Sequence, residues 1–129
     1  MDRPALRRLA QVATAFSAAI ILYATLTPSP ENPSGMPDWA AHLVLFTALG
    51  AAAALWYATS DAARRGPRRA LFMVVLALWL FGGLTELAQG RVEGRTMALS
   101  DLGFDVLGAV LGFIGGSVLW RMLLARLGR

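Results

Sequence analysis

The chain has 129 residues, of which 57% are hydrophobic and only 16% are charged. A soluble domain carries about a quarter charged residues, so this composition indicates a single membrane domain covering residues 1–129 and argues against a soluble helical bundle. The chain has no cysteine, which excludes disulfides and thiolate chemistry.

Four apolar segments are predicted to be transmembrane helices, at about residues 7–27, 39–59, 70–88 and 102–124. A helix of about 20 residues, rising roughly 1.5 Å per residue, spans the ~30 Å hydrocarbon layer of a bilayer. The first segment follows three arginines, as a cleaved signal peptide would, but it is long for such a peptide and no clear cleavage site follows it. We therefore interpret it as an uncleaved membrane anchor.

Prolines and glycines mark the connections between these segments. Residues 27–37 contain four prolines and are predicted to form an extended loop. Asp38 directly follows this loop, where its carboxylate is expected to cap the second helix. Gly66 and Pro67 interrupt the second connection, and Ser100 or Asp101 is expected to cap the fourth helix.

The arginines predict the orientation of the chain. Ten of the twelve lie before the first segment, in the second connection or near the C-terminus. Four spans place these three regions on one side of the membrane, which the positive-inside rule assigns to the cytoplasm. Because the connections are short, the sequence predicts an all-α antiparallel four-helix bundle with its N- and C-terminal ends inside. Topology and contact with anionic membrane lipids explain the arginines, so nucleic acid is not expected as a partner.

Ionisable side chains gather in the outward half, which also contains Glu31 and Glu93. Four of them lie within or at the ends of the apolar segments: His42, Glu86, Asp101 and Asp105. Such a group costs roughly 3 kcal/mol at the centre of a lipid-exposed helix, so it usually faces the bundle interior or a wet cavity. Helical spacing places three pairs each on one helix face: Asp38 with His42, Glu86 with Gln89, and Asp101 with Asp105. We expect these faces to converge, with Arg91 and Arg95 of the third connection as counter-charges.

Glycines continue the polar faces toward the middle of the membrane. They lie at helical spacing on three of the predicted helices: Gly50, Gly82, Gly108, Gly112 and Gly116. A stripe without side chains lets another helix backbone approach closely. The helix that packs on the stripe of the fourth segment belongs either to the same chain or to a second copy, which would make a homo-oligomer through the Gly108, Gly112 and Gly116 face.

In their order and spacing, these residues resemble the VanZ-like family of small bacterial membrane proteins. The matching motifs are Asp38-x-x-x-His42-x-x-x-Phe46-x-x-x-Gly50, Glu86-x-x-Gln89, Arg95, and Asp101-x-x-x-Asp105-x-x-Gly108-x-x-x-Gly112. They cover about residues 37–116. Two positions depart from the family pattern, because Trp39 stands where a lysine is common and Asp105 where an asparagine is common.

The resemblance implies a multi-pass protein of the bacterial inner membrane and cell envelope. The family is linked to reduced susceptibility to teicoplanin-type glycopeptide antibiotics, and the resemblance supplies neither a reaction nor a cofactor. It implies membrane lipids and a lipid-linked envelope precursor as partners.

Three hypotheses for the polar residues remain open. In the first, they satisfy one another and only hold the helices in register. In the second, they form an outward pocket that recognises a polar headgroup, through residues expected to bind it: Asp38, Gln89, Arg91, Arg95 and Asp105. In the third, the protein is an enzyme in which His42 is the acid or base, Glu86 or Asp101 orients it, and Arg95 stabilises developing negative charge.

Two further possibilities complete the set. One histidine with two or three carboxylates suits a hard divalent cation, but the sequence has no closely spaced ligand motif, so no metal is predicted. A proton-coupled transporter is the other possibility, although four helices leave one copy little room for a pathway.

Overall fold

The computed structural model describes residues 3–28 and 35–127, so Glu31 lies outside the described residues. The chain forms five helices in the described ranges: α1 (Arg3–Leu26), α2 (Asp38–Thr59), α3 (Asp61–Arg65), α4 (Pro67–Gln89) and α5 (Leu99–Leu127). All except α3 are long and apolar enough to cross a membrane. The predictions of an all-helical fold and of four membrane-spanning segments are confirmed at this level.

The helix ends differ from the predicted ones for local reasons. Helix α4 begins at Pro67, because a proline at the first helical position loses no hydrogen bond. Helix α5 begins at Leu99, so Ser100 and Asp101 lie inside its first turn and the capping prediction for them is wrong. The prediction for Asp38 is wrong as well, because Pro37 occupies the cap position of α2 and no side chain caps that end.

The short helix α3 was not predicted. The side chain of Ser60 accepts a hydrogen bond from the backbone N–H of Ala63 at 3.1 Å, which caps this helix at its start. Asp61 lies in its first turn and Arg64 and Arg65 in its last turn, where each charge opposes the helix dipole. The second connection is therefore ordered rather than a simple turn.

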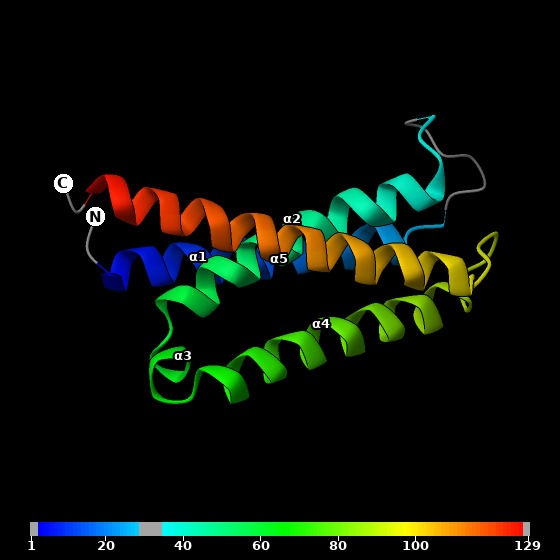
Figure 1. Cartoon of the computed structure of the whole chain (residues 1–129). Coiled ribbons are helices and arrows are strands. Elements are labelled where there is room, and N and C mark those ends of the chain that lie inside the picture. The colour runs from blue at the N-terminus through cyan, green and yellow to red at the C-terminus, as the bar shows by residue number, and fades with distance from the viewer. Residues whose placement is uncertain (1–2, 29–34, 128–129) are drawn as a thin grey trace.

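The helices share two ends in space (Figure 1). The start of α1, the short helix α3 and the end of α5 lie together at one end, which we call the arginine-rich end. The start of α2 and the connection between α4 and α5 lie at the opposite end, which we call the site end. Helix α4 diverges from the other long helices toward the arginine-rich end (Figure 1).

Helices α2 and α5 form the closest pair. A Cβ atom added to Gly108 would lie 2.5 Å from the carbonyl oxygen of Leu43, and one added to Gly116 would lie 2.9 Å from that of Ala51. Cβ atoms added to Gly50 or Gly112 would overlap backbone carbonyls of the facing helix. The glycine stripe of α5 is therefore covered by α2 of the same chain, whereas a homo-oligomer through this face stays a prediction.

The outer surface of the bundle is apolar. A small buried cluster at its centre contains Ile21, Phe46, Leu49 and Ala109. By contrast, Phe16, Tyr23 and Leu84 are 64–73% exposed. Extensive exposed apolar surface needs a covering, which a lipid bilayer provides. The chain is thus a multi-pass membrane protein.

Candidate functional site

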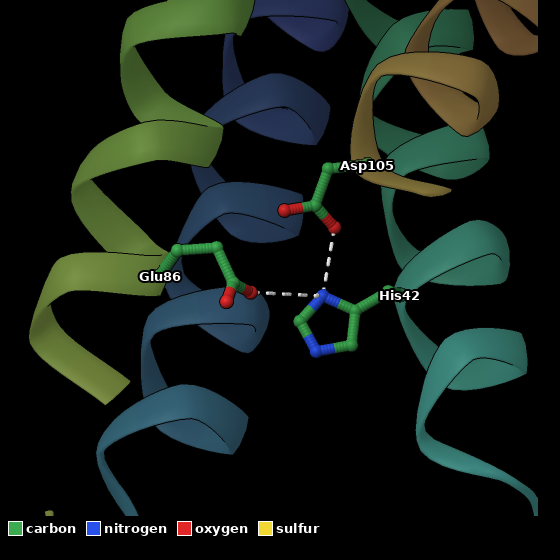
Figure 2. Close-up of side chains that lie close together, drawn as sticks. All are labelled: His42, Glu86 and Asp105. Carbon is green, nitrogen blue, oxygen red and sulfur yellow. Dashed lines mark hydrogen bonds and ion pairs between the residues drawn. The ribbon is translucent and has the colours of Figure 1, made fainter. Parts of the chain in front are cut away.

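Three side chains from three different helices meet near the site end (Figure 2). The Nδ1 atom of His42, on α2, lies 2.8 Å from Oδ1 of Asp105, on α5. The same nitrogen lies 3.6 Å from Oε1 of Glu86, on α4. Asp105 is 1% exposed and Glu86 is 3% exposed, so both carboxyl groups are buried. The structure therefore brings His42 together with two acids that lie more than forty positions later in the sequence.

The hydrogen bond to Asp105 orients the imidazole. When Asp105 is ionised its carboxylate only accepts, and Nδ1 of His42 then donates in this bond. The other ring nitrogen, Nε2, points away from both carboxyl groups (Figure 2). In a neutral imidazole with a proton on Nδ1, Nε2 is the acceptor. The ring can therefore accept a proton or a hydrogen bond at Nε2 while Asp105 holds it in place.

The acid that orients His42 is not the expected one. Asp101 was predicted as one of two orienting carboxylates, but Asp105 makes the bond and Glu86 lies slightly further away. Glu86 is itself held by the backbone N–H of Ala98, which donates to its Oε2 at 3.3 Å. This bond ties the end of α4 to the residue that precedes α5.

Gly82 leaves room for the Asp105 carboxylate. A Cβ atom added to Gly82 would lie 3.5 Å from Oδ2 of Asp105 and 3.4 Å from Leu102, which are ordinary contact distances. Gly82 therefore differs from the glycines between α2 and α5, because no backbone approaches it closely.

A cavity of about 630 Å³ adjoins the imidazole. Its charged, imidazole and amide lining comes from α2, α4, α5 and the connection between α4 and α5: Asp38, His42, Gln89, Arg95 and Asp101. Apolar residues of α1 and α2, among them Ile21 and Phe46, form part of the remaining wall. Pockets for small molecules have volumes of roughly 300–1,000 Å³ and combine apolar walls with a few polar groups. The cavity fits this description.

Arg95 plays a part that the sequence did not indicate. Its guanidinium donates to the backbone carbonyl of Ala24 at 3.1 Å and to that of Thr27 at 3.5 Å. Cations at this position stabilise the carbonyl end of a helix, here α1. Among the described residues, neither Arg95 nor Arg91 forms an ion pair with an acid, and Arg91 is exposed and does not line the cavity. The prediction that they are counter-charges of the acidic residues is wrong.

The polar groups around His42 satisfy one another only in part. Within the described part of the chain, three buried side-chain atoms lack a hydrogen-bond partner: Glu86 Oε1, Arg95 Nε and Asp105 Oδ2. Leaving a buried polar group without a partner costs about 1–3 kcal/mol, and such groups in native proteins often mark functional sites. All three atoms belong to residues of this site.

The same three residues could hold a metal ion. One ligand atom each from His42, Glu86 and Asp105 lies within 4.8 Å of the others. One imidazole with two carboxylates suits a hard divalent cation. Binding through Nδ1 of His42 would have to replace the hydrogen bond to Asp105, because both use the same atom.

The first helix, for which no site residue was predicted, also lines the cavity. Thr25 and Thr27, near the end of α1, line the cavity together with Tyr23. Thr25 is also buried, with 5% of its surface exposed. Hydroxyl groups at the outer end of an otherwise apolar segment were the signal in the sequence that could have indicated this contribution.

No family model, no curated protein and no solved structure matches this chain.

Proposed function

We propose that the chain is an antiparallel four-span protein of the bacterial inner membrane, with its N- and C-terminal ends in the cytoplasm. The distribution of arginines supports this orientation, because ten of twelve belong to the two terminal regions and the connection that contains α3. These regions lie at one end of the molecule (Figure 1). In this orientation the cavity beside His42 opens toward the outer side.

Membership of the VanZ-like family is part of this proposal. The residues that carry the resemblance include the three side chains that meet at the site: His42, Glu86 and Asp105. The departure at Asp105 is compatible with it, because the amide oxygen of an asparagine could also accept a hydrogen bond from Nδ1 of His42. A role in the cell envelope and in susceptibility to teicoplanin-type antibiotics would follow from membership and is part of the same proposal.

The proposed function is recognition of the polar headgroup of an amphiphilic envelope component. It rests on one observation, that charged, imidazole and amide side chains from four elements line a single cavity. The lining contains two carboxylates, Asp38 and Asp101, whereas its arginine, Arg95, donates a hydrogen bond to a backbone carbonyl of α1. Such a lining favours a headgroup that donates hydrogen bonds through hydroxyl, amine or amide groups. The sugar and peptide parts of a lipid-linked envelope precursor have this chemistry.

A purely structural network is the weaker explanation. A network that only sets helix register is stabilising when its members are satisfied, and a partly satisfied one is costly. The unpartnered atoms of Glu86, Arg95 and Asp105 are those of a partly satisfied network. The α2–α5 register is also fixed by the glycine contacts, which need no polar group.

Proton transfer by His42 is the second candidate function. The 2.8 Å bond from Nδ1 to Asp105 holds the ring, while Nε2 points away from the carboxyl groups. A base oriented by a carboxylate is the arrangement that general acid–base catalysis uses. His42 would then take a proton from a hydroxyl group of the bound headgroup, or from water.

Binding can be tested with purified protein in lipid nanodiscs. We expect a lipid-linked cell-wall precursor to bind at least about tenfold more tightly than polyprenyl phosphate, which has the same lipid without the sugar and peptide. Asp101→Asn should remove most of this preference, because hydrogen bonds to charged groups contribute about 1.5–3 kcal/mol. Glu93→Gln is the matched control, because Glu93 is exposed and does not line the cavity. Equal affinity for the two ligands would refute headgroup recognition.

The two candidate functions separate in the same preparation. If His42 transfers a proton in catalysis, mass spectrometry will detect a changed precursor with the native protein and an unchanged one with His42→Gln. Binding of the precursor without any change would leave recognition as the function and remove the enzyme hypothesis.

A further inference from the structure

A second cavity lies toward the arginine-rich end, between α4 and the helices α1 and α2. Its volume is about 850 Å³. Its walls are mainly apolar and include Leu49, Trp56, Met73, Leu78 and Phe81. It lies where α4 diverges from the other long helices (Figure 1). We call it the inner groove.

Arginines line the end of the inner groove near α3. Arg7 donates to Oδ2 of Asp61 at 2.9 Å, so the charges of these two residues compensate each other. Arg65 and Arg69 also line the groove, and within the described residues neither forms an ion pair. The groove is therefore apolar along its walls and carries two uncompensated positive charges at one end.

The positive-inside rule does not explain which arginines line the groove. The connection between α2 and α4, taken together with the first turn of α4, contains four arginines, and any of them would serve to orient the chain. Only Arg65 and Arg69 line the groove, whereas Arg64 and Arg68 do not. Cations beside an apolar slot between transmembrane helices are the chemistry that binds anionic lipid headgroups.

We propose that the inner groove binds one anionic phospholipid from the surrounding bilayer. Its phosphate lies against Arg65 and Arg69, and an acyl chain lies along the apolar walls between α4 and α1. Charge complementarity selects this occupant, because a transmembrane helix of a second copy would leave both guanidinium groups without an acceptor. The inference does not depend on the function proposed for the cavity beside His42.

The test uses vesicles that contain equal amounts of phosphatidylglycerol and phosphatidylcholine. After gentle extraction, native mass spectrometry should show one retained phosphatidylglycerol per chain and little phosphatidylcholine. Each arginine near an anionic lipid contributes about fivefold in affinity, so the double variant Arg65→Gln/Arg69→Gln should lower the preference for phosphatidylglycerol by about 25-fold. The matched control, Arg64→Gln/Arg68→Gln, removes the same charge from the same connection and should keep the preference.

A third variant tests the apolar part of the groove without any change of charge. Ala77 lines the groove, and Ala77→Phe would fill the space proposed for the acyl chain. We expect this variant to retain no phospholipid while keeping its helical circular dichroism. Equal retention of the two phospholipids by the native protein would overturn the proposal. An equal loss of preference in both double variants would also overturn it, because the attraction would then be diffuse over the whole connection. A dimer that Ala77→Phe abolishes would overturn it too, because a second copy would then fill the groove.

Discussion

Adding one methyl group at Gly108 should separate α2 from α5 at the level of the candidate site. The new Cβ atom would lie 2.5 Å from the carbonyl oxygen of Leu43 and 3.1 Å from the backbone nitrogen of Thr47. Both atoms belong to helix backbone, so no side-chain rotation can relieve the overlap. To reach 3.4 Å, the lower limit of ordinary contact, the helices must move apart by about 0.9 Å.

This displacement is large compared with the tolerance of the site. If α5 moved by that amount along the line from His42 to Asp105, their 2.8 Å bond would lengthen to about 3.7 Å, beyond hydrogen-bond distance. Overpacking of this kind costs about 1–3 kcal/mol of stability. Gly103→Ala is the matched control, because a Cβ atom at Gly103 meets nothing within 4 Å. Replacing glycine by alanine inside a helix favours both variants by about 1 kcal/mol, so the two should differ by the overpacking cost of roughly 1–3 kcal/mol.

Two measurements check this prediction. Unfolding by sodium dodecyl sulfate, followed by circular dichroism, gives the stability difference between Gly108→Ala and Gly103→Ala. His42 is the only histidine of the chain, so nitrogen NMR of isotope-labelled histidine reports its Nδ1 hydrogen bond without overlap. We expect Gly108→Ala to change the imidazole spectrum and Gly103→Ala to preserve it. Equal stability together with an unchanged spectrum in both variants would show that the α2–α5 approach is not as close as described.

Three further substitutions have distinct expected outcomes. Asp105→Asn keeps an acceptor for Nδ1 of His42, so the imidazole NMR signal should still show a hydrogen bond, and its loss would mean that the bond depends on the charge of Asp105. Arg95→Gln removes the donor to the carbonyl end of α1 and should lower the stability against detergent unfolding by about 1–2 kcal/mol. No change in unfolding would assign Arg95 to ligand binding alone. Ser60→Ala removes the cap of α3 at a cost of about 1 kcal/mol, and hydrogen exchange at the backbone N–H of Ala63 should become faster. Unchanged exchange there would contradict the capping role.

The sequence predicted the helices well because the bilayer sets their length. An apolar segment of about 20 residues has few structural alternatives in lipid, so the four spans follow from composition alone. The glycine spacing on α5 likewise predicted a close helix contact, although two partners were open. The short helix α3 was not predicted because its capping residue, Ser60, directly follows the end of α2, so no loop in the sequence separates the two helices.

The choice of acid beside His42 could not be predicted from periodicity. Asp101 and Asp105 are one helical turn apart on the same face of α5, so either could have faced α2. The axial position of α5 along α2 decides between them. Gly108 lies against Leu43, and this contact brings Asp105, one turn earlier, to the level of His42. Asp101 is then displaced toward the end of the helix, where it lines the cavity.

The position of Arg95 was unpredictable for a different reason. In the sequence it stands among acids, which made it an obvious counter-charge. In the structure it is bound by backbone carbonyls of Ala24 and Thr27, which every helix end offers and no sequence pattern reveals. A cation that stabilises a helix end is less free to bind a phosphate, and for this reason we propose a headgroup that donates hydrogen bonds.

The site is assembled from two parts of the molecule that are held in different ways. His42 and Asp105 belong to α2 and α5, whose backbones touch through the glycines, and their contact is 2.8 Å. Glu86 belongs to α4, and its contact with His42 is longer, at 3.6 Å. The glycine contacts therefore fix the orientation of the imidazole, whereas the position of Glu86 depends on how α4 packs.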